Sequence, residues 1–344
     1  MDQAVAHGPV PVGEVDLVDR VAREDGEDAF LAPHATRAEG AGDRARPEAP
    51  DRFRTCFQRD LDRIQHSRPF RRLAGKCQVF VAPDDDHLRT RLTHAIEVAQ
   101  VAASIARGAR LNVALTTAAA MGHDCGHGPA GHASEDALSP FVPGGYHHAV
   151  YGADVVLEPL NLCAETLDAI RNHSWNRPTP MTPEGEVVAW ADRIAYVCHD
   201  FEDALDAGIV AVADLPAGVR DVVGTGRSTQ LGSFVSAMLE TIAETGVVAL
   251  RSPEADALAA FRSFNYERIY LRPAAQEQAR RVIAVIQALT EHFAEHPRTP
   301  ELAPGSDVAV AEAVRYVSGM TDRFALDLAV GTLGWDTAAL PRGV

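Results

Sequence analysis

Apolar residues recur at helical spacing along most of the chain. The pattern begins near Phe53, and later residues such as Leu92, Ile96 and Ala99 fall three or four positions apart, which places them on one face of a helix. Further segments with this pattern lie at 112–121, 134–138, 151–158, 164–172, 186–207, 231–245, 254–270, 274–296 and 308–332. The spacing predicts a protein built from many amphipathic helices.

Strand patterns are nearly absent from the sequence. They are limited to short runs such as 78–81 and 247–250. Clusters of Pro and Gly at 140–145, 177–185 and 216–226 indicate loops between helices. The predicted fold class is therefore all-α, a helical bundle with additional helices.

The first fifty residues differ from the rest of the chain. Residues 1–50 are rich in Ala, Gly, Pro and charge, with little periodicity beyond 15–21, so we predict an irregular or partly disordered arm that adds little to the core. A helical chain of 344 residues can fill its length around one core. We expect one large domain at 51–344, with its core at 59–210 and a C-terminal helical extension at 227–335.

Composition argues against several classes of protein. Apolar residues make up 46% of the chain, but no apolar run approaches the roughly 20 residues that cross a bilayer. Residues 1–20 lack a basic segment followed by an apolar one, so no signal peptide is expected and the predicted location is cytoplasmic. The five cysteines form no C-x-x-C pair, which favours reduced thiols.

The formal charge of −16 disfavours nonspecific binding to membranes or nucleic acid. We expect no membrane partner, and nucleic acid at most as a regulator. One basic island stands out, made of Arg59, Arg63, Arg68, Arg71, Arg72, Lys76, Arg89 and Arg91. It suits a compact polyanion, or it is a solvated helix face paired with nearby acids.

Histidines and acids are concentrated in the middle of the chain. Ten of the fourteen histidines lie between His66 and His199, and two dense clusters occur at 123–127 and 131–135. Asp192 lies inside an apolar helical segment, where an unpaired carboxylate is costly to bury. A divalent cation would supply the missing charge, and a salt bridge to an arginine is the alternative.

Two imidazoles and two carboxylates follow one another as His94, His123, Asp124 and Asp192. This mixed nitrogen and oxygen set suits Mn, Fe, Co, Ni or Zn. The order resembles the H…HD…D signature of the HD-domain phosphohydrolase superfamily. The resemblance implies an HD-type bundle that binds one divalent metal ion per subunit, whether Mn²⁺, Mg²⁺, Fe²⁺, Co²⁺, Ni²⁺ or Zn²⁺.

Longer segments narrow the resemblance to one family. They include 57–60 (FQRD), 70–73 (FRRL), 86–94 (DHLRTRLTH), 191–196 (ADRIAY) and 319–323 (GMTDR). These look like the deoxyguanosine triphosphate triphosphohydrolase-like family, over roughly residues 23–333. Membership implies hydrolysis of deoxynucleoside triphosphates at the α-phosphorus, which yields deoxynucleoside and inorganic triphosphate. It also implies a homo-oligomer, commonly a hexamer or tetramer.

The resemblance implies four catalytic residues. His132 and Glu135 would form a dyad, because positions i and i+3 share a helix face and Glu135 could orient the imidazole for proton transfer. His127 would stabilise charge on the phosphate or the leaving group. His148 aligns with the family's active-site histidine, although Ala149 stands where the family usually has Asn.

Six further residues match the family's substrate contacts. Arg91 and Arg193 would bind phosphates, and the planar fork of Arg91 suits two phosphoryl oxygens at once. The matching sugar contacts are Gln78, Tyr196, Asp200 and Tyr316. A tyrosine packed against C2′ would exclude a 2′-hydroxyl and so select deoxyribose.

Two other functions stay open at this point. The chain could be an HD phosphohydrolase for another nucleotide, such as a monophosphate or a pathway-specific nucleotide. It could also be a non-catalytic nucleotide-binding regulator. Of the three functions, only the dNTP triphosphohydrolase would release intact triphosphate. Metal-dependent turnover of any dNTP would exclude the non-catalytic regulator.

Overall fold

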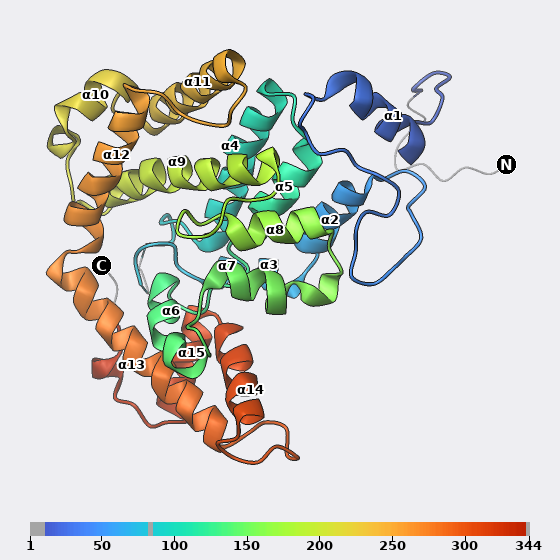
Figure 1. Ribbon diagram of the computed structural model, residues 1–344. Coiled ribbons are helices and arrows are strands. Elements are labelled where there is room, and N and C mark those ends of the chain that lie inside the picture. The colour runs from blue at the N-terminus through green and yellow to red at the C-terminus, as the bar shows by residue number, and fades with distance from the viewer. Residues whose placement is uncertain (1–10, 82–84, 342–344) are drawn as a thin grey trace.

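Helices dominate the structure, a computed structural model that describes residues 11–81 and 85–341 (Figure 1). No strand occurs among these residues, and the run at 78–81 is flanked only by an isolated bridge between Cys77 and Thr90. The all-α prediction is confirmed. In the part of the chain that is described, no helix has both the length and the apolar character needed to cross a membrane.

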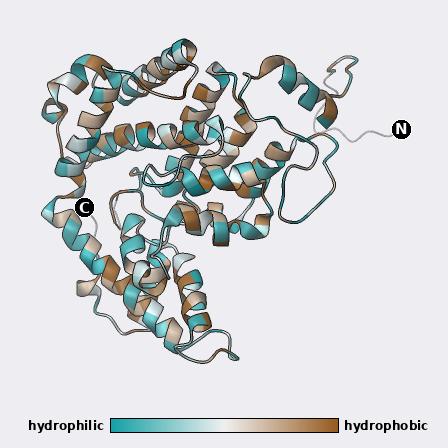
Figure 2. Cartoon of the chain, viewed as in Figure 1, coloured by the Kyte–Doolittle hydropathy of each residue, from teal (hydrophilic) through white to brown (hydrophobic). Residues whose placement is uncertain are grey.

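The centre of the molecule is a bundle around three helices. These are α4 (Arg91–Gly108), α5 (Val113–Gly122) and α9 (Pro183–Asp206), with α2 (Cys56–Gln65) and α8 (Ala164–Asn172) packed against α5. Many of their inward positions are Ala or Val, so the helix axes can approach closely. Figure 2 shows polar and apolar residues alternating around these helices, as expected for amphipathic helices.

A second apolar cluster lies below the central bundle in Figure 1. It is formed by α6 (His132–Leu138), α13 (Pro273–Glu295), α14 (Asp307–Ser318) and α15 (Asp322–Gly331), which pack on one another. The cluster is separate from the main core, and two of its members, Ala130 and Ala137, lie on either side of His132 in the chain.

The remaining helices complete the outer layers. They are α1 (Arg20–Phe30), α3 (Arg68–Arg72), α7 (His148–Tyr151), α10 (Ala217–Val223), α11 (Arg227–Thr245) and α12 (Glu254–Asn265), with π-helical turns at 152–156 and 266–270. Helices α11 and α12 pack on α9.

Two predicted boundaries are wrong. The segment 308–332 is two helices, because the side chain of Thr321 accepts a hydrogen bond from the backbone N–H of Phe324 and starts α15. The predicted loop at 216–226 contains α10, whose Val219 and Val223 are buried in the main core. A local cap divides the first segment, and burial in the core accompanies a helix in the second one despite its Gly and Pro residues.

The N-terminal arm adds to the core, contrary to the prediction. Residues 1–10 lie outside the described part, but α1 is helical and Leu31 and Ala35 belong to the main apolar core. Further along, the Arg44 guanidinium lies 2.6 Å from Oδ1 of Asp60, and both side chains are buried. The arm therefore supplies the positive charge that a buried carboxylate on α2 requires.

Candidate active site

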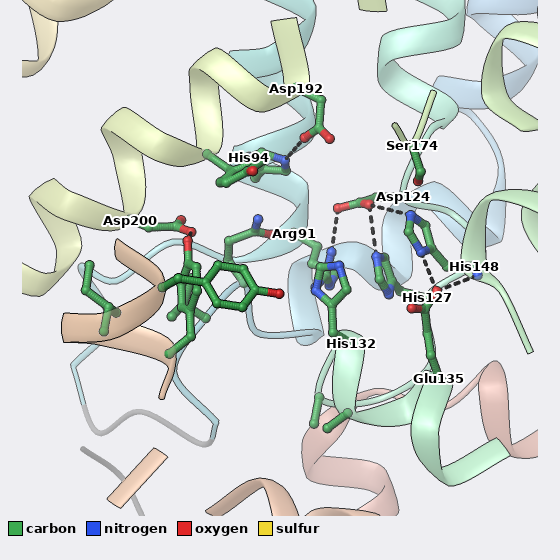
Figure 3. A pocket seen from close by; sticks show the side chains of 18 of the residues that line it. Arg91, His94, Asp124, His127, His132, Glu135, His148, Ser174, Asp192 and Asp200 are labelled. Carbon is green, nitrogen blue, oxygen red and sulfur yellow. Dashed lines mark hydrogen bonds and ion pairs between the residues drawn. The ribbon is translucent and has the colours of Figure 1, made fainter. Parts of the chain in front are cut away.

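A cavity of about 570 Å³ opens where α4, α9, α12 and α13 meet the loops around residues 78–81 and 124–135. Its size suits a small-molecule site. Figure 3 shows imidazoles and carboxylates converging in it from several helices. The predicted site residues that line it are Gln78, Arg91, His94, Asp124, His127, His132, Glu135, His148, Asp192, Arg193, Tyr196 and Asp200.

The four predicted metal ligands come together. His94 projects from α4 and Asp192 from α9, and His94 Nε2 lies 3.0 Å from Asp192 Oδ1. His123 and Asp124 follow the end of α5, and His123 Nε2 lies 3.4 Å from Asp124 Oδ1 and 3.6 Å from Asp192 Oδ1. Donor atoms of His94, His123 and Asp124 all lie within 4.8 Å of one another, close enough to share an ion.

Local backbone structure aims His123 at this centre. Its Nδ1 lies 2.6 Å from the carbonyl oxygen of Ala120, one turn earlier, so Nδ1 carries the proton and donates. Nε2 is therefore left with a lone pair, and it is buried without a hydrogen-bond partner. A histidine that donates its other ring N–H to a carbonyl is typical of a metal ligand.

The electrostatics also fit a cation. Burial by itself would raise the pKa of Asp124, but the Arg91 guanidinium and the neighbouring imidazoles hold that pKa well below its usual range. Asp192 is similar: burial raises its pKa, while the neighbouring imidazoles of His94 and His123 bring that pKa below the ordinary value. Two ionised carboxylates thus lie among imidazoles, and this donor set suits a divalent transition metal.

Arg91 is the arginine that reaches this centre. Its Nη1 donates to Asp124 Oδ2 at 2.7 Å, its Nε and Nη2 are buried without a hydrogen-bond partner, and the residue lines the cavity. Among the described residues, Asp192 has no arginine partner, which removes the salt-bridge alternative for it. Gly131, at φ +61°, leaves room for this guanidinium, since a Cβ there would lie 2.2 Å from Arg91 Nη2.

The predicted pairing of Glu135 with His132 is wrong. Glu135 Oε1 instead accepts hydrogen bonds from the backbone N–H of His148 at 2.7 Å and from its Nδ1 at 2.5 Å (Figure 3). His132 stands at the first position of α6 with its side chain exposed to the cavity, and its ring lies 4.9 Å from that of His127. Helical spacing indicated His132 as the partner, whereas the fold brings His148 to Glu135.

His173 is a site residue that the sequence did not single out. It is buried at the end of α8, and its Nε2 lies 3.2 Å from Nε2 of His148. Its ring is also 4.9 Å from that of His123. The sequence contained one indication of its role, namely its position in the histidine-rich stretch. His66 and His87 lie in the same stretch but are exposed, so that indication did not single out His173.

The opposite wall carries the predicted substrate contacts. The Arg193 guanidinium carbon lies 3.3 Å from the centre of the Trp175 ring, and the hydroxyl of Tyr196 accepts a hydrogen bond from Arg262 Nε at 3.0 Å. Gln78 lines the cavity with its amide oxygen unpartnered. The wall therefore presents two guanidinium groups and aromatic surface.

Asp200 and two tyrosines complete this wall, but Tyr316 does not. Burial raises the pKa of Asp200 to about 8, and the hydroxyl of Tyr270 donates to its Oδ2. Tyr316 is not among the residues that line the cavity, and its ring lies 4.9 Å from that of Phe293. Tyr266 and Tyr270, missed from the sequence, supply the aromatic surface instead.

Three arginines of the basic island are paired with acids away from the cavity. Arg59 and Arg63 both contact Glu48, and Arg89 contacts Glu97, Glu202 and Asp203. Of the eight basic residues, Arg91 alone lines the cavity within the described part. The interpretation as a paired helix face therefore holds for the arginines at 59, 63 and 89.

Comparison with family models gives two matches. The HD domain model matches residues 91–197, which contain every candidate metal ligand, and the phosphohydrolase-associated domain model matches residues 248–330. The first span runs from α4 into α9, and the second covers α12 to α15.

Whole-chain relatives carry one shared name. A deoxyguanosinetriphosphate triphosphohydrolase-like protein from Caldanaerobacter subterraneus subsp. tengcongensis is 38% identical, over 89% of this chain and 93% of its own length. Proteins of the same name from Clostridium perfringens and Desulfatibacillum aliphaticivorans are 36% and 35% identical, over 82% and 86% of this chain and 87% and 93% of their own lengths. A crystal structure of a hypothetical protein from Aquifex aeolicus shares the fold, with a TM-score of 0.53 at 15% identity over 80% of this chain and 68% of its own.

Proposed function

Since the chain belongs to the deoxyguanosinetriphosphate triphosphohydrolase-like family of HD-domain phosphohydrolases, we propose that it hydrolyses deoxynucleoside triphosphates at the α-phosphorus. The products would be deoxynucleoside and inorganic triphosphate. Support comes from the cavity, in which buried His and Asp donors face a wall of guanidinium and aromatic groups.

The metal would be held by His94, His123, Asp124 and Asp192. A divalent ion bound there supplies a Lewis acid next to the phosphate and lowers the pKa of water. The identity of the ion follows from the donor set only as far as a divalent metal that accepts both imidazole and carboxylate.

Arg91 would bind the phosphate beside this centre. Its Nη1 is occupied by Asp124, but its Nε and Nη2 are buried without partners, and buried N–H groups of this kind are costly unless a ligand accepts from them. The proposal rests mainly on these two unpartnered nitrogen atoms of the Arg91 guanidinium. Arg193 and Arg262, on the opposite wall, would bind the phosphate groups of the substrate that lie further from the sugar.

Proton transfer would fall to the histidines at the start of α6. His132 is exposed to the cavity and His127 lies beside it, whereas His148 is held by Glu135. His132 is therefore the candidate to move a proton to the leaving group through a ring nitrogen. Glu135 would act as a positioning residue for His148.

Deoxyribose would lie against Tyr196 and Gln78, with Asp200 beyond them. The unpartnered amide oxygen of Gln78 and the unpartnered Oδ1 of Asp200 are available for hydrogen bonds to a sugar hydroxyl. A ring packed at C2′ would reject ribose by steric exclusion.

Product analysis tests the proposal. The protein is loaded with Mn²⁺ and incubated with each dNTP and each NTP, and the products are separated by anion-exchange chromatography. We expect intact triphosphate and free deoxynucleoside. Release of pyrophosphate or single phosphate groups would instead indicate a different phosphohydrolase, and hydrolysis of monophosphates alone would replace the proposed substrate class.

A further inference from the structure

The loop that precedes α6 is tied to the C-terminal helices by a carboxylate outside the cavity. Oδ1 of Asp322, the first residue of α15, accepts a hydrogen bond from the backbone N–H of Ala130 at 2.7 Å. Its Oδ2 accepts another from the backbone N–H of Cys77 at 2.8 Å. One side chain therefore joins three segments that lie far apart in the chain.

Lys76 makes a second connection between the same segments. Its side chain is buried, and its ammonium group donates to the carbonyl oxygen of His127 and, at 2.9 Å, to that of Ser318. His127 belongs to the loop before α6, and Ser318 is the last residue of α14. We call Lys76 and Asp322, together with the four backbone groups that they bind, the junction.

The turn that the junction holds has a backbone conformation that needs support. Ala130 has φ +58° and Gly131 has φ +61°, and this left-handed region is unfavourable for a residue with a Cβ. Such a conformation persists where surrounding contacts fix it, as the hydrogen bond to Asp322 does here. His132 follows as the first residue of α6, and a Cβ on Gly131 would lie 2.2 Å from Arg91 Nη2. A shift of this turn would therefore move His132 relative to Arg91.

We propose that Lys76 and Asp322 are positioning residues for the reaction, which hold the turn before α6 so that His132 reaches the substrate bound by Arg91. The inference rests on the proposed function for the roles of His132 and Arg91. Asp322 is not among the described residues that line the cavity, so it would act through the backbone. Misplacement of a reacting group by about 1 Å can cost on the order of 100-fold in rate. The motif at 319–323 thereby gains a role in the reaction.

Asp322→Asn tests the inference with little change in shape. An amide has one acceptor oxygen for the two backbone N–H groups, so one hydrogen bond is lost. We expect kcat for the preferred dNTP to fall by about 10-fold to 100-fold, while KM and bound metal change little. Asp307→Asn is the matched control: Asp307 is also the first residue of a helix after a hydroxyl N-cap, but its side chain is exposed. It should leave kcat unchanged.

A double substitution separates positioning from a loss of folded protein. If Asp322 acts through His132, then Asp322→Asn should lower the residual turnover of His132→Ala little, because the group that it positions is already absent. A purely structural role would lower the turnover of both backgrounds by the same factor. An equal factor in the two backgrounds, or loss of bound metal together with activity, would overturn the inference.

Hydrogen exchange measured by mass spectrometry tests the junction without turnover. Amides in peptides covering 127–132 should exchange faster in Asp322→Asn than in the parent protein, and Asp307→Asn should match the parent. Unchanged exchange there overturns the inference. Faster exchange in a protein that hydrolyses no dNTP would reject the proposed function and keep Asp322 as the residue that holds the turn. Circular dichroism checks folding, and Lys76→Met, which breaks the other half of the junction, replaces Asp322→Asn with the same expectations if that variant unfolds.

Discussion

The two walls of the cavity differ in how their polar groups are held. On the metal-facing wall, the histidines that end helices are fixed by carbonyl groups three residues earlier, as His123 is by Ala120 and His173 by Ile170. On the opposite wall, partners are far apart in the chain: Tyr196 pairs with Arg262 and Asp200 with Tyr270. Local structure thus orients the two helix-ending histidines of one wall, whereas the contacts of the other wall depend on how α12 packs against α9.

Because of this difference, we expect substitutions on the two walls to have different effects. The metal-facing wall holds ionised carboxylates among buried imidazoles, so loss of one ligand disturbs a whole set. The opposite wall is made of pairwise contacts between side chains, so single changes there should alter selectivity more than the reaction itself. Four changes test this contrast.

Loss of Asp192 should have the largest effect. Asp192→Ala removes a carboxylate that lies 3.0 Å from His94 Nε2 and 3.6 Å from His123 Nε2, and the remaining donors should hold a cation weakly. We expect metal content to fall well below one ion per chain and turnover to fall to background. Elemental analysis and a dNTP hydrolysis assay measure both. Asp206→Ala, at the exposed end of the same helix, is the matched control, and full metal occupancy in Asp192→Ala would contradict the assignment.

His132→Ala should have the next largest effect, and it should act on turnover alone. General acid and base groups contribute about 100-fold to 10,000-fold, so kcat should fall by that order while bound metal stays unchanged. Steady-state kinetics and elemental analysis on the same sample measure the two quantities, with His66→Ala as the control. Loss of metal together with activity would place His132 among the ligands instead.

The sequence predicted the metal-facing wall far better than its counterpart. The four residues His94, His123, Asp124 and Asp192 converge in the structure, and each belongs to a helix, or to a helix end, that periodicity locates. His173 was missed because a histidine at the end of a helix has no pattern of its own. The pairing of Glu135 with His132 failed because helical spacing states which residues share a face, and not which neighbour packs against that face.

The residues of the opposite wall were harder to predict from the sequence, because helix packing decides which of them line the cavity. Tyr196 and Asp200 lie on α9 and were identified, but Tyr266 and Tyr270 come from a π-helical turn after α12 that periodicity does not distinguish from a regular helix. Tyr316 was expected there, and its place on α14 directs it to the second apolar cluster. A motif match can single out a residue in the sequence. The packing of the helices then determines whether its side chain lines the cavity.

Tyr196→Ala should have an intermediate effect, on sugar selectivity, and comparison with Tyr316→Ala tests whether Tyr316 lies outside the sugar pocket. Tyr196→Ala opens the wall where a 2′-hydroxyl would clash, so the ratio of kcat/KM for dGTP to that for GTP should fall by about 10-fold or more. Tyr316→Ala, whose ring lies outside the cavity, should leave this ratio unchanged. The ratio is insensitive to the fraction of folded enzyme, since both substrates meet the same sample. An equal fall in both variants would return Tyr316 to the sugar pocket.

The smallest expected effect is on stability and concerns Asp200. Burial raises the pKa of Asp200 to about 8 from an ordinary value of 3.8, so the folded protein holds a proton there that the unfolded chain has released. Stability is therefore lost as the pH rises from about 4 towards 8, because ionisation favours the unfolded state in that window. Asn keeps the shape of the side chain but cannot ionise. Asp200→Asn should differ little from the parent at pH 4 and should melt a few degrees higher at pH 8.

Thermal denaturation monitored by circular dichroism across this pH range measures the difference between the two proteins. The hydrogen bond from Tyr270 can still be accepted by the amide oxygen of Asn, so its loss does not complicate the comparison. Asp206→Asn, on the exposed end of α9, should show no pH-dependent gain because water already solvates its charge. A melting temperature of Asp200→Asn that stays at or below the parent value at pH 8 would mean that Asp200 is ionised in the folded protein. Its charge would then require a cationic partner, and the opposite wall would share the electrostatic character of the metal-facing wall.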